Sequence, residues 1–172
     1  MTESARRQRN EDRLAECHPI ARDRFSRIIE DLEADGFRPR IQDAFRSLAD
    51  QAIALETGNS DVEWGMHNAM APDGTPEALA IDLLDDNSPL KPSWLYTLRL
   101  YQHARRRQCR TGVLFRLKGA ARAILRAALD AGVHDYHGLI GFDPCHVEIA
   151  DLTYGMAKAG LRPTDGVDSP AA

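Results

Sequence analysis

Two histidines and one aspartate stand out because of the residues around them. His67 lies in the segment Trp-Gly-Met-His-Asn, and His146 lies in Asp-Pro-Cys-His-Val-Glu. Asp82 ends a short apolar run, where a carboxylate is costly unless it is paired or binds a metal ion. Two imidazoles and one carboxylate are a common ligand set for zinc, with water in the fourth position. Zinc lowers the pKa of such a water and polarises a carbonyl group.

A further carboxylate is needed to take a proton from the water and pass it to a leaving amine. Asp143 stands three residues before His146 and is placed for that task. Pro144 between them favours a turn or an extended segment, so this is not a helical pair of histidines. Each feature alone has an ordinary explanation as a hydrogen-bonded histidine, a loop cap or a turn, and only their combination indicates a metal site.

Together and in this order, the residues resemble those of peptidase family M15, the zinc D-Ala-D-Ala carboxypeptidases and L-alanyl-D-glutamate endopeptidases that include phage endolysins. That family has Arg-Ser followed by Gln after a strand, then SxHxxGxAxD, then a carboxylate three residues before a histidine. The resemblance covers about residues 19–160. The matching residues in this chain are Arg46-Ser47 with Gln51, His67 with Ala80-Ile81-Asp82, and Asp143 with His146.

The resemblance implies a zinc site with His67, Asp82 and His146 as ligands. It implies that Asp143 is the general base. It also implies that Arg46 holds the substrate or stabilises the developing oxyanion, for which a fixed positive charge is suited. The implied activity is hydrolysis of peptidoglycan stem peptides, and the implied fold is that of the hedgehog and D-Ala-D-Ala peptidases.

This chain departs from the family pattern around the second motif. Gly65 replaces the serine and Ala78 replaces the glycine, and His67 and Asp82 are fifteen positions apart because of an insertion. Asp73 lies in the insertion and competes with Asp82 as the third ligand. We favour Asp82, because a rigid strand holds a ligand better than the tip of a loop.

The elements that must position these residues are short helices and strands. Helical spacing of apolar residues, capping patterns and breakers predict the helices, and alternation predicts the strands. This mixture predicts an α+β fold with a small, mostly antiparallel sheet flanked by helices. We expect a single domain over residues 13–161 with flexible tails at 1–12 and 162–172. The expected helices cover Ile20–Leu32, Ser47 to about Gly58, a segment from Pro92 through Tyr101, Leu117–Ala128 and Ala150–Ala159; the expected strands cover Phe37–Phe45 at a sheet edge, Ala78–Leu84 and the region of Val147–Ile149.

Composition excludes several classes of protein. The 172 residues are 43% hydrophobic and 28% charged, which is typical of a globular domain rather than a disordered or fibrous chain. No apolar run approaches the length of a membrane span, and the arginine-rich N-terminus lacks the apolar core of an export signal. Three scattered cysteines favour a reducing compartment. We expect synthesis in the cytoplasm, a monomer, and action in the periplasm or cell wall after release.

Charge is distributed unevenly along the chain. Residues 51–90 contain eight acids and no Lys or Arg, whereas residues 91–129 contain ten Lys or Arg and no acid. The basic residues are expected mainly on the solvated faces of two helices, although the stretch from Lys91 to Arg126 leaves a nucleic-acid-binding protein as an alternative. No nucleic-acid motif supports that alternative, so nucleic acid is not an expected partner. The other alternative is a catalytically silent, zinc-containing module of the same fold.

Overall fold

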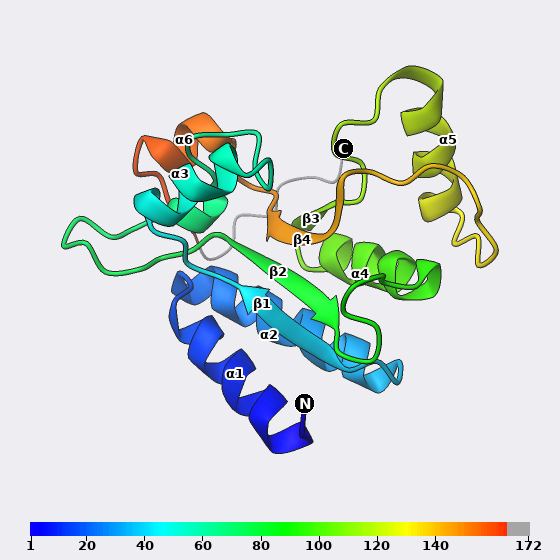
Figure 1. Cartoon of the computed structure of the whole chain (residues 1–172), viewed down its shortest axis with the longest axis horizontal. Coiled ribbons are helices and arrows are strands. Elements are labelled where there is room, and N and C mark those ends of the chain that lie inside the picture. The colour runs from blue at the N-terminus through cyan, green and yellow to red at the C-terminus, as the bar shows by residue number, and fades with distance from the viewer. Residues whose placement is uncertain (165–172) are drawn as a thin grey trace.

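The computed structural model describes residues 1–164, which form six α-helices, one short 3₁₀ helix and a four-stranded sheet (Figure 1). In chain order the elements are α1 (Glu3–Ala15), α2 (Pro19–Ala34), β1 (Pro39–Asp43), α3 (Leu48–Glu56), η1 (Met66–Asn68), β2 (Ala80–Asp85), α4 (Trp94–Arg106), β3 (Cys109–Gly112), α5 (Gly119–Asp130), β4 (Asp143–Ile149) and α6 (Tyr154–Lys158).

The four strands pair antiparallel in the order β1-β2-β4-β3. This confirms the predicted α+β fold with a small antiparallel sheet. The two central strands, β2 and β4, are far apart in the sequence, and their register places Asp82 directly opposite His146. Residues that face each other across an antiparallel pair point to the same side of the sheet, so this register brings the two side chains together.

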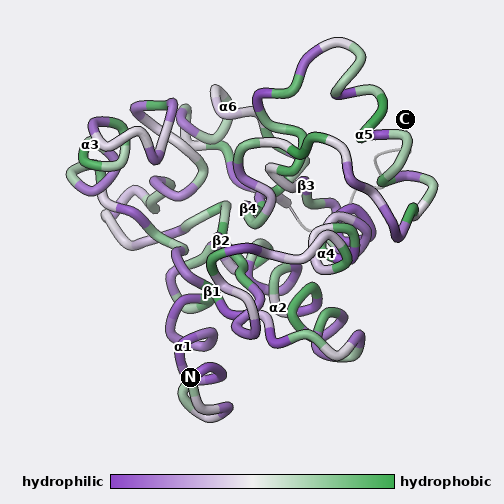
Figure 2. The backbone as a smooth tube through the Cα atoms, turned by 45° about the vertical axis from the view of Figure 1, so that its right-hand side comes forward, coloured by the Kyte–Doolittle hydropathy of each residue, from purple (hydrophilic) through white to green (hydrophobic). Residues whose placement is uncertain are grey.

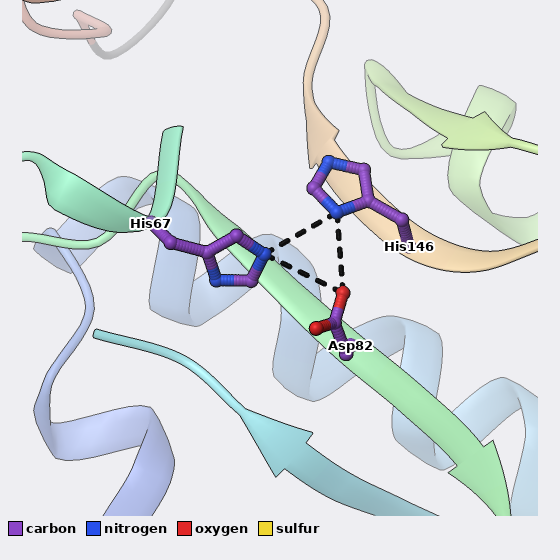
Figure 3. Close-up of side chains that lie close together, drawn as sticks. All are labelled: His67, Asp82 and His146. Atoms are coloured by element: carbon purple, nitrogen blue, oxygen red, sulfur yellow. Dashed lines mark hydrogen bonds and ion pairs between the residues drawn. The ribbon is translucent and has the colours of Figure 1, made fainter. Parts of the chain in front are cut away.

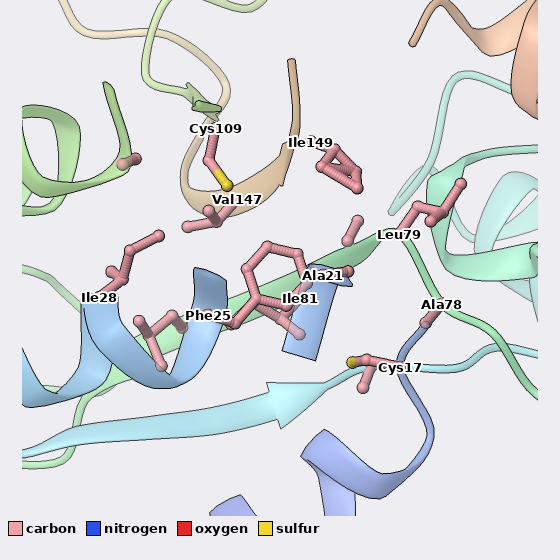
Figure 4. Packing of buried hydrophobic residues seen from close by; sticks show 14 of the residues in the cluster. Cys17, Ala21, Phe25, Ile28, Ala78, Leu79, Ile81, Cys109, Val147 and Ile149 are labelled. Atoms are coloured by element: carbon pink, nitrogen blue, oxygen red, sulfur yellow. The ribbon is translucent and has the colours of Figure 1, made fainter. Parts of the chain in front are cut away.

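The opposite side of the sheet forms the hydrophobic core. Ile81 on β2 and Val147 and Ile149 on β4 alternate with the polar residues and are fully buried. They pack against α2, whose Phe25 and Ile28 belong to the same buried cluster and lie near Ile81 and Val147 in Figure 4. Helix α4 contributes buried side chains to the same cluster. The sheet therefore has one apolar face covered by helices and one face on which polar residues gather.

A second, smaller cluster joins α4 and α5. It is built from buried residues that include Leu98 and Tyr101 of α4 and Leu125 and Leu129 of α5. The basic residues of this region lie largely on its outside, and several are paired with acids, as in the contacts of Arg105 with Asp130 and Arg107 with Asp31. These pairs neutralise part of the charge that the sequence concentrates in this stretch.

Several sequence predictions are confirmed by the elements. Pro39 begins β1, which lies at the edge of the sheet as expected for a strand that contains proline. Ser47 caps α3 by accepting a hydrogen bond from the backbone N–H of Asp50. Strand β3 is an element that no sequence pattern predicted. In the predicted C-terminal tail, Arg162 forms an ion pair with Glu77, and residues 165–172 lie outside the described residues.

The prediction of a flexible tail over residues 1–12 is wrong, because α1 occupies this region. The helix is mostly hydrophilic (Figure 2), so hydrophobic periodicity did not reveal it. Its polar side chains cover the open edge of β1. Asn10 accepts a hydrogen bond from Ile41 N (2.8 Å) and donates one to Pro39 O (3.0 Å), while Arg9 donates to Ile41 O (2.8 Å). A buried side-chain amide thus replaces the pairing that a fifth strand would supply.

Replacing Asn10 with alanine is expected to destabilise the protein by about 1–3 kcal/mol, because the buried N–H of Ile41 loses its acceptor, whereas Pro39 O loses one donor and keeps Arg6 Nη1. Urea unfolding followed by circular dichroism measures the change. Gln8→Ala is the matched control, since Gln8 is exposed on the same helix and bonds only within it to Asp12. Equal stability of the two variants would contradict a structural role for α1.

Candidate metal centre

The polar face of the sheet carries the three residues whose types suit a metal. Asp82 comes from β2, His146 from β4 and His67 from η1, which lies beside the central strands (Figure 3). His67 Nε2 lies 3.3 Å from His146 Nδ1 and 3.4 Å from Asp82 Oδ1, and His146 Nδ1 lies 3.2 Å from Asp82 Oδ1. Both histidines are more than nine-tenths buried. Within residues 1–164 this is the one such group of three potential ligands.

These distances fit a tetrahedral zinc site. Zinc binds imidazole nitrogen and carboxylate oxygen at about 2.0–2.1 Å, so neighbouring ligand atoms in a tetrahedron lie about 3.3–3.4 Å apart. The three separations in the structure, 3.2, 3.3 and 3.4 Å, agree with that value. Three protein ligands leave one position of the tetrahedron open, as in catalytic rather than structural zinc sites.

Each histidine makes a hydrogen bond with the ring nitrogen that points away from Asp82, and this bond defines which nitrogen keeps a lone pair for a metal. His67 Nδ1 lies 2.6 Å from Ala44 O, which can only accept, so this nitrogen carries the proton. His146 Nε2 lies 2.9 Å from Glu148 Oε2 and donates to that carboxylate. In neutral rings the lone pairs then lie on His67 Nε2 and His146 Nδ1, which face Asp82. Three electron-pair donors therefore converge on one point. Metal-binding histidines commonly donate their other ring N–H to a backbone carbonyl or a carboxylate, as His67 and His146 do here.

The electrostatics also favour positive charge at the centre of this group. Burial opposes ionisation of Asp82, but interactions with the imidazoles of His67 and His146 outweigh it and hold the pKa of Asp82 well below its usual range. Burial likewise lowers the pKa of His146, yet hydrogen bonds to Asp82 and Glu148 raise it to about 10. A proton on His146 then supplies the positive charge, and metal binding displaces such a proton.

Glu148 supports His146 and is a site residue that was not predicted from the sequence. Its side chain is almost fully buried and, besides His146, it accepts hydrogen bonds from Arg110 Nε (2.5 Å) and Tyr154 Oη (3.2 Å). Arg110 lies directly opposite Glu148 in the β3–β4 register. The available signal was the spacing: residues two apart in a strand share a face, so Glu148 had to lie beside His146.

Asp143 lies at the start of β4 and lines the same cleft of about 530 Å³ as the three candidate ligands. Burial raises its pKa, and the nearby charge of Asp82 adds to this effect. Its position depends on Gly112 of β3, where an added Cβ would collide with the backbone carbonyl of Asp143. The absence of a side chain at Gly112 therefore allows the chain to bring Asp143 to the cleft.

Arg46 also lines the cleft, and it is held by several partners. Its Nε and Nη2 donate to Asp43 Oδ2 at 2.9 and 2.8 Å, and Nη1 donates to Gln51 Oε1 at 3.2 Å. Nη2 also lies 3.5 Å from Asp82 Oδ2, the carboxylate oxygen turned away from the histidines. The guanidinium is thus a fixed positive charge next to the candidate ligand Asp82.

The structure also places Asp73, the competing ligand candidate, and two further residues of types that can bind a metal. Asp73 is exposed and accepts a hydrogen bond from Thr75 N, so it is Asp82 that the fold brings to the histidines. Cys145 points into the hydrophobic core, as expected for a neighbour of His146 in a strand. His137 pairs with Asp135 in an exposed loop and does not line this cleft.

Comparison with known proteins supports the fold. No family model matches the sequence, and no curated protein is significantly similar to it. The chain does, however, have the fold of a peptidase. One similar solved structure is the crystal structure of Serratia marcescens L-Ala D-Glu endopeptidase ChiX, with a TM-score of 0.50 and 17% sequence identity, over 82% of this chain and 86% of that chain. None of the helices within residues 1–164 is long and apolar enough to cross a membrane.

Replacing Glu148 with glutamine is expected to weaken zinc binding by about 10–100-fold, the usual effect of losing an outer partner of a ligating histidine. Glutamine keeps the size of the side chain but removes the charge that orients and polarises His146. Competition with a chromophoric chelator measures the affinity. Glu77→Gln is the control, because Glu77 pairs with Arg162 away from the cleft. Equal zinc affinities for both variants would contradict this role.

Proposed function

We propose that this protein is a zinc-dependent peptidase of the M15 type that hydrolyses peptidoglycan stem peptides. The zinc ligands are His67, Asp82 and His146, Asp143 is the general base, and Arg46 assists at the substrate. The observation that carries the proposal is the convergence of three lone-pair atoms at tetrahedral zinc spacing in an open cleft. The similarity in fold to an L-Ala D-Glu endopeptidase supports the substrate class.

The chain's own residues have separate tasks in this reaction. Bound zinc would polarise the scissile carbonyl and lower the pKa of a water molecule. Asp143 takes the proton from the attacking water and delivers it to the leaving amine. Arg46 faces the cleft as a fixed cation, suited to hold a carboxylate of the peptide or to stabilise negative charge on the scissile oxygen. Glu148 keeps His146 in the tautomer whose Nδ1 faces the metal position.

We further propose that the protein acts on the cell wall as a monomer after release from the cytoplasm. The polar cleft beside the candidate metal ligands fits an extended peptide better than a nucleic acid, because both acidic and basic residues line it. Asp61, Asp143 and Glu148 are interspersed there with Arg46 and Arg110. A surface for nucleic acid would instead be predominantly basic.

Zinc-replete protein is expected to contain about one zinc per chain, and His67→Ala is expected to lose it while remaining folded. Removal of one of three ligands leaves two, too few for tight binding. Elemental analysis with circular dichroism measures both properties. His137→Ala is the control, since this histidine is exposed and outside the group. A folded wild-type protein without metal under these conditions would overturn the proposed function.

Asp143→Asn is expected to retain zinc but to lower hydrolysis of purified peptidoglycan by about 10²–10⁴-fold, since an amide cannot carry the proton. Release of new amino groups from the polymer measures the rate, with zinc content determined in parallel. Asp135→Asn, in the exposed loop before β4, controls for loss of a carboxylate. A wild-type rate for Asp143→Asn would show that Asp143 has a structural role and is not the general base. Hydrolysis absent from the zinc-loaded wild type would favour a silent binding module.

A further inference from the structure

Arg116 occupies an unusual position on the rim of the cleft. It lies in the connection between β3 and α5 and has a φ of 63°, a left-handed conformation that residues with a Cβ rarely adopt. Its neighbour Phe115 packs against the candidate ligand His146, with ring centroids 5.6 Å apart. Arg116 and Phe115 both line the cleft. The backbone thus directs this arginine to the immediate surroundings of the metal centre.

The guanidinium of Arg116 is oriented by two contacts. Its Nε and Nη2 donate to the two carboxylate oxygens of Asp61, which gives a bidentate pair. Its Cζ also lies 3.4 Å from the centroid of the Phe142 ring, so the ring supports the planar group from one side. Phe142 immediately precedes Asp143, the proposed general base. The guanidinium of Arg116 is therefore held close to Asp143 in the cleft.

The carboxylate of Asp61 can be displaced from Arg116 by a carboxylate of a bound molecule. It belongs to the loop after α3, its side chain is 60% exposed, and the pair connects this loop with the β3–α5 connection across the cleft. An ion pair between exposed side chains is weak, because water and salt screen it. A planar carboxylate from a bound molecule can take the same two hydrogen bonds, which is the geometry that arginine recognises best.

We propose that Arg116 is a carboxylate-binding subsite of the cleft, occupied by Asp61 in the free protein and by a carboxylate of the peptide substrate in the complex. The ring of Phe142 supports the Arg116 guanidinium in this subsite. This inference rests on the proposed function and extends it, because it makes a free carboxylate near the scissile bond a requirement for good substrates. A stem peptide offers such a group in the α-carboxyl of its D-glutamate, and amidation of that group would remove the charge.

The test compares two synthetic stem tripeptides, L-Ala-γ-D-Glu-L-Lys with a free D-glutamate α-carboxyl and the same peptide with that carboxyl amidated. For the wild type, we expect kcat/KM to favour the free acid by about 10-fold or more, the effect of a hydrogen-bonded charge. Arg116→Gln should lose this preference, so that the two peptides are hydrolysed with similar kcat/KM. Asp61→Asn should lower KM for the free acid about two- to fivefold, because the competing carboxylate is gone.

Arg105→Gln is the matched control. Arg105 also pairs with an aspartate, Asp130, and lies over an aromatic ring, Tyr101, but it does not line this cleft. This variant changes the net charge by the same amount and should keep the wild-type preference for the free acid. Loss of preference in Arg105→Gln would show that overall charge, not Arg116, determines it, and would overturn the proposal.

A binding measurement separates this inference from the proposed function. Titration calorimetry of both peptides with metal-free protein should give a lower Kd for the free acid in the wild type and equal Kd values in Arg116→Gln. Equal Kd values in the wild type, or no measurable binding of either peptide, would overturn the carboxylate subsite. If neither peptide is hydrolysed by the zinc-loaded protein but the Kd difference depends on Arg116, the peptidase proposal fails and the subsite stands.

Discussion

The arrangement of this molecule depends on bringing three electron-pair donors to one point in the middle of a sheet. Asp82 and His146 face each other across the two central strands, and His67 completes the group from a short 3₁₀ helix. Without a bound metal ion or a proton on His146, such a group is unfavourable, since buried acceptors that face one another have no hydrogens to share. The fold holds them there through the strand register and the buried outer partners of both histidines.

The rest of the structure serves to keep that register. The apolar face of β2 and β4 packs on α2 and α4, and a slip of one residue would turn Asp82 and His146 into the core. On the polar face, Arg110 and Tyr154 satisfy the buried carboxylate of Glu148, which would otherwise be costly so close to an apolar core. The edge of β1 is closed by polar side chains of α1, so the sheet ends within the molecule.

The cleft around the candidate metal centre combines fixed charges with replaceable ones. Arg46 is held by Asp43 and Gln51 and contacts Asp82, so its position belongs to the framework. Arg116 instead pairs with an exposed aspartate across the cleft and rests on an exposed aromatic ring. Two arginines of the same cleft therefore differ in kind. One is fixed beside a proposed zinc ligand, and the other offers its hydrogen bonds to whatever carboxylate enters.

Local sequence predicted much of the framework. Helical periodicity identified the element that became α2, and Ser47 marked the start of α3. Alternation around Val147 identified β4, and Pro39 indicated that β1 would lie at an edge. Such signals are carried by neighbouring residues, because helix periods, caps and strand alternation depend on short-range sterics and hydrogen bonds. The prediction of a flexible N-terminal tail is wrong because α1 carries no such local signal. The helix is stabilised by contacts with a distant strand rather than by its own apolar pattern.

The sequence by itself determined the types and order of the residues that now lie together: His67, Asp82, Asp143 and His146, with Arg46 nearby. It also gave reasons to prefer Asp82 over Asp73, which the fold supports by placing Asp73 in an exposed loop. Only the tertiary structure decided which lone pairs converge, that Glu148 orients His146, and that Arg116 meets Asp61 across the cleft. These facts depend on strand register and on contacts between residues far apart in the chain, which no local pattern encodes.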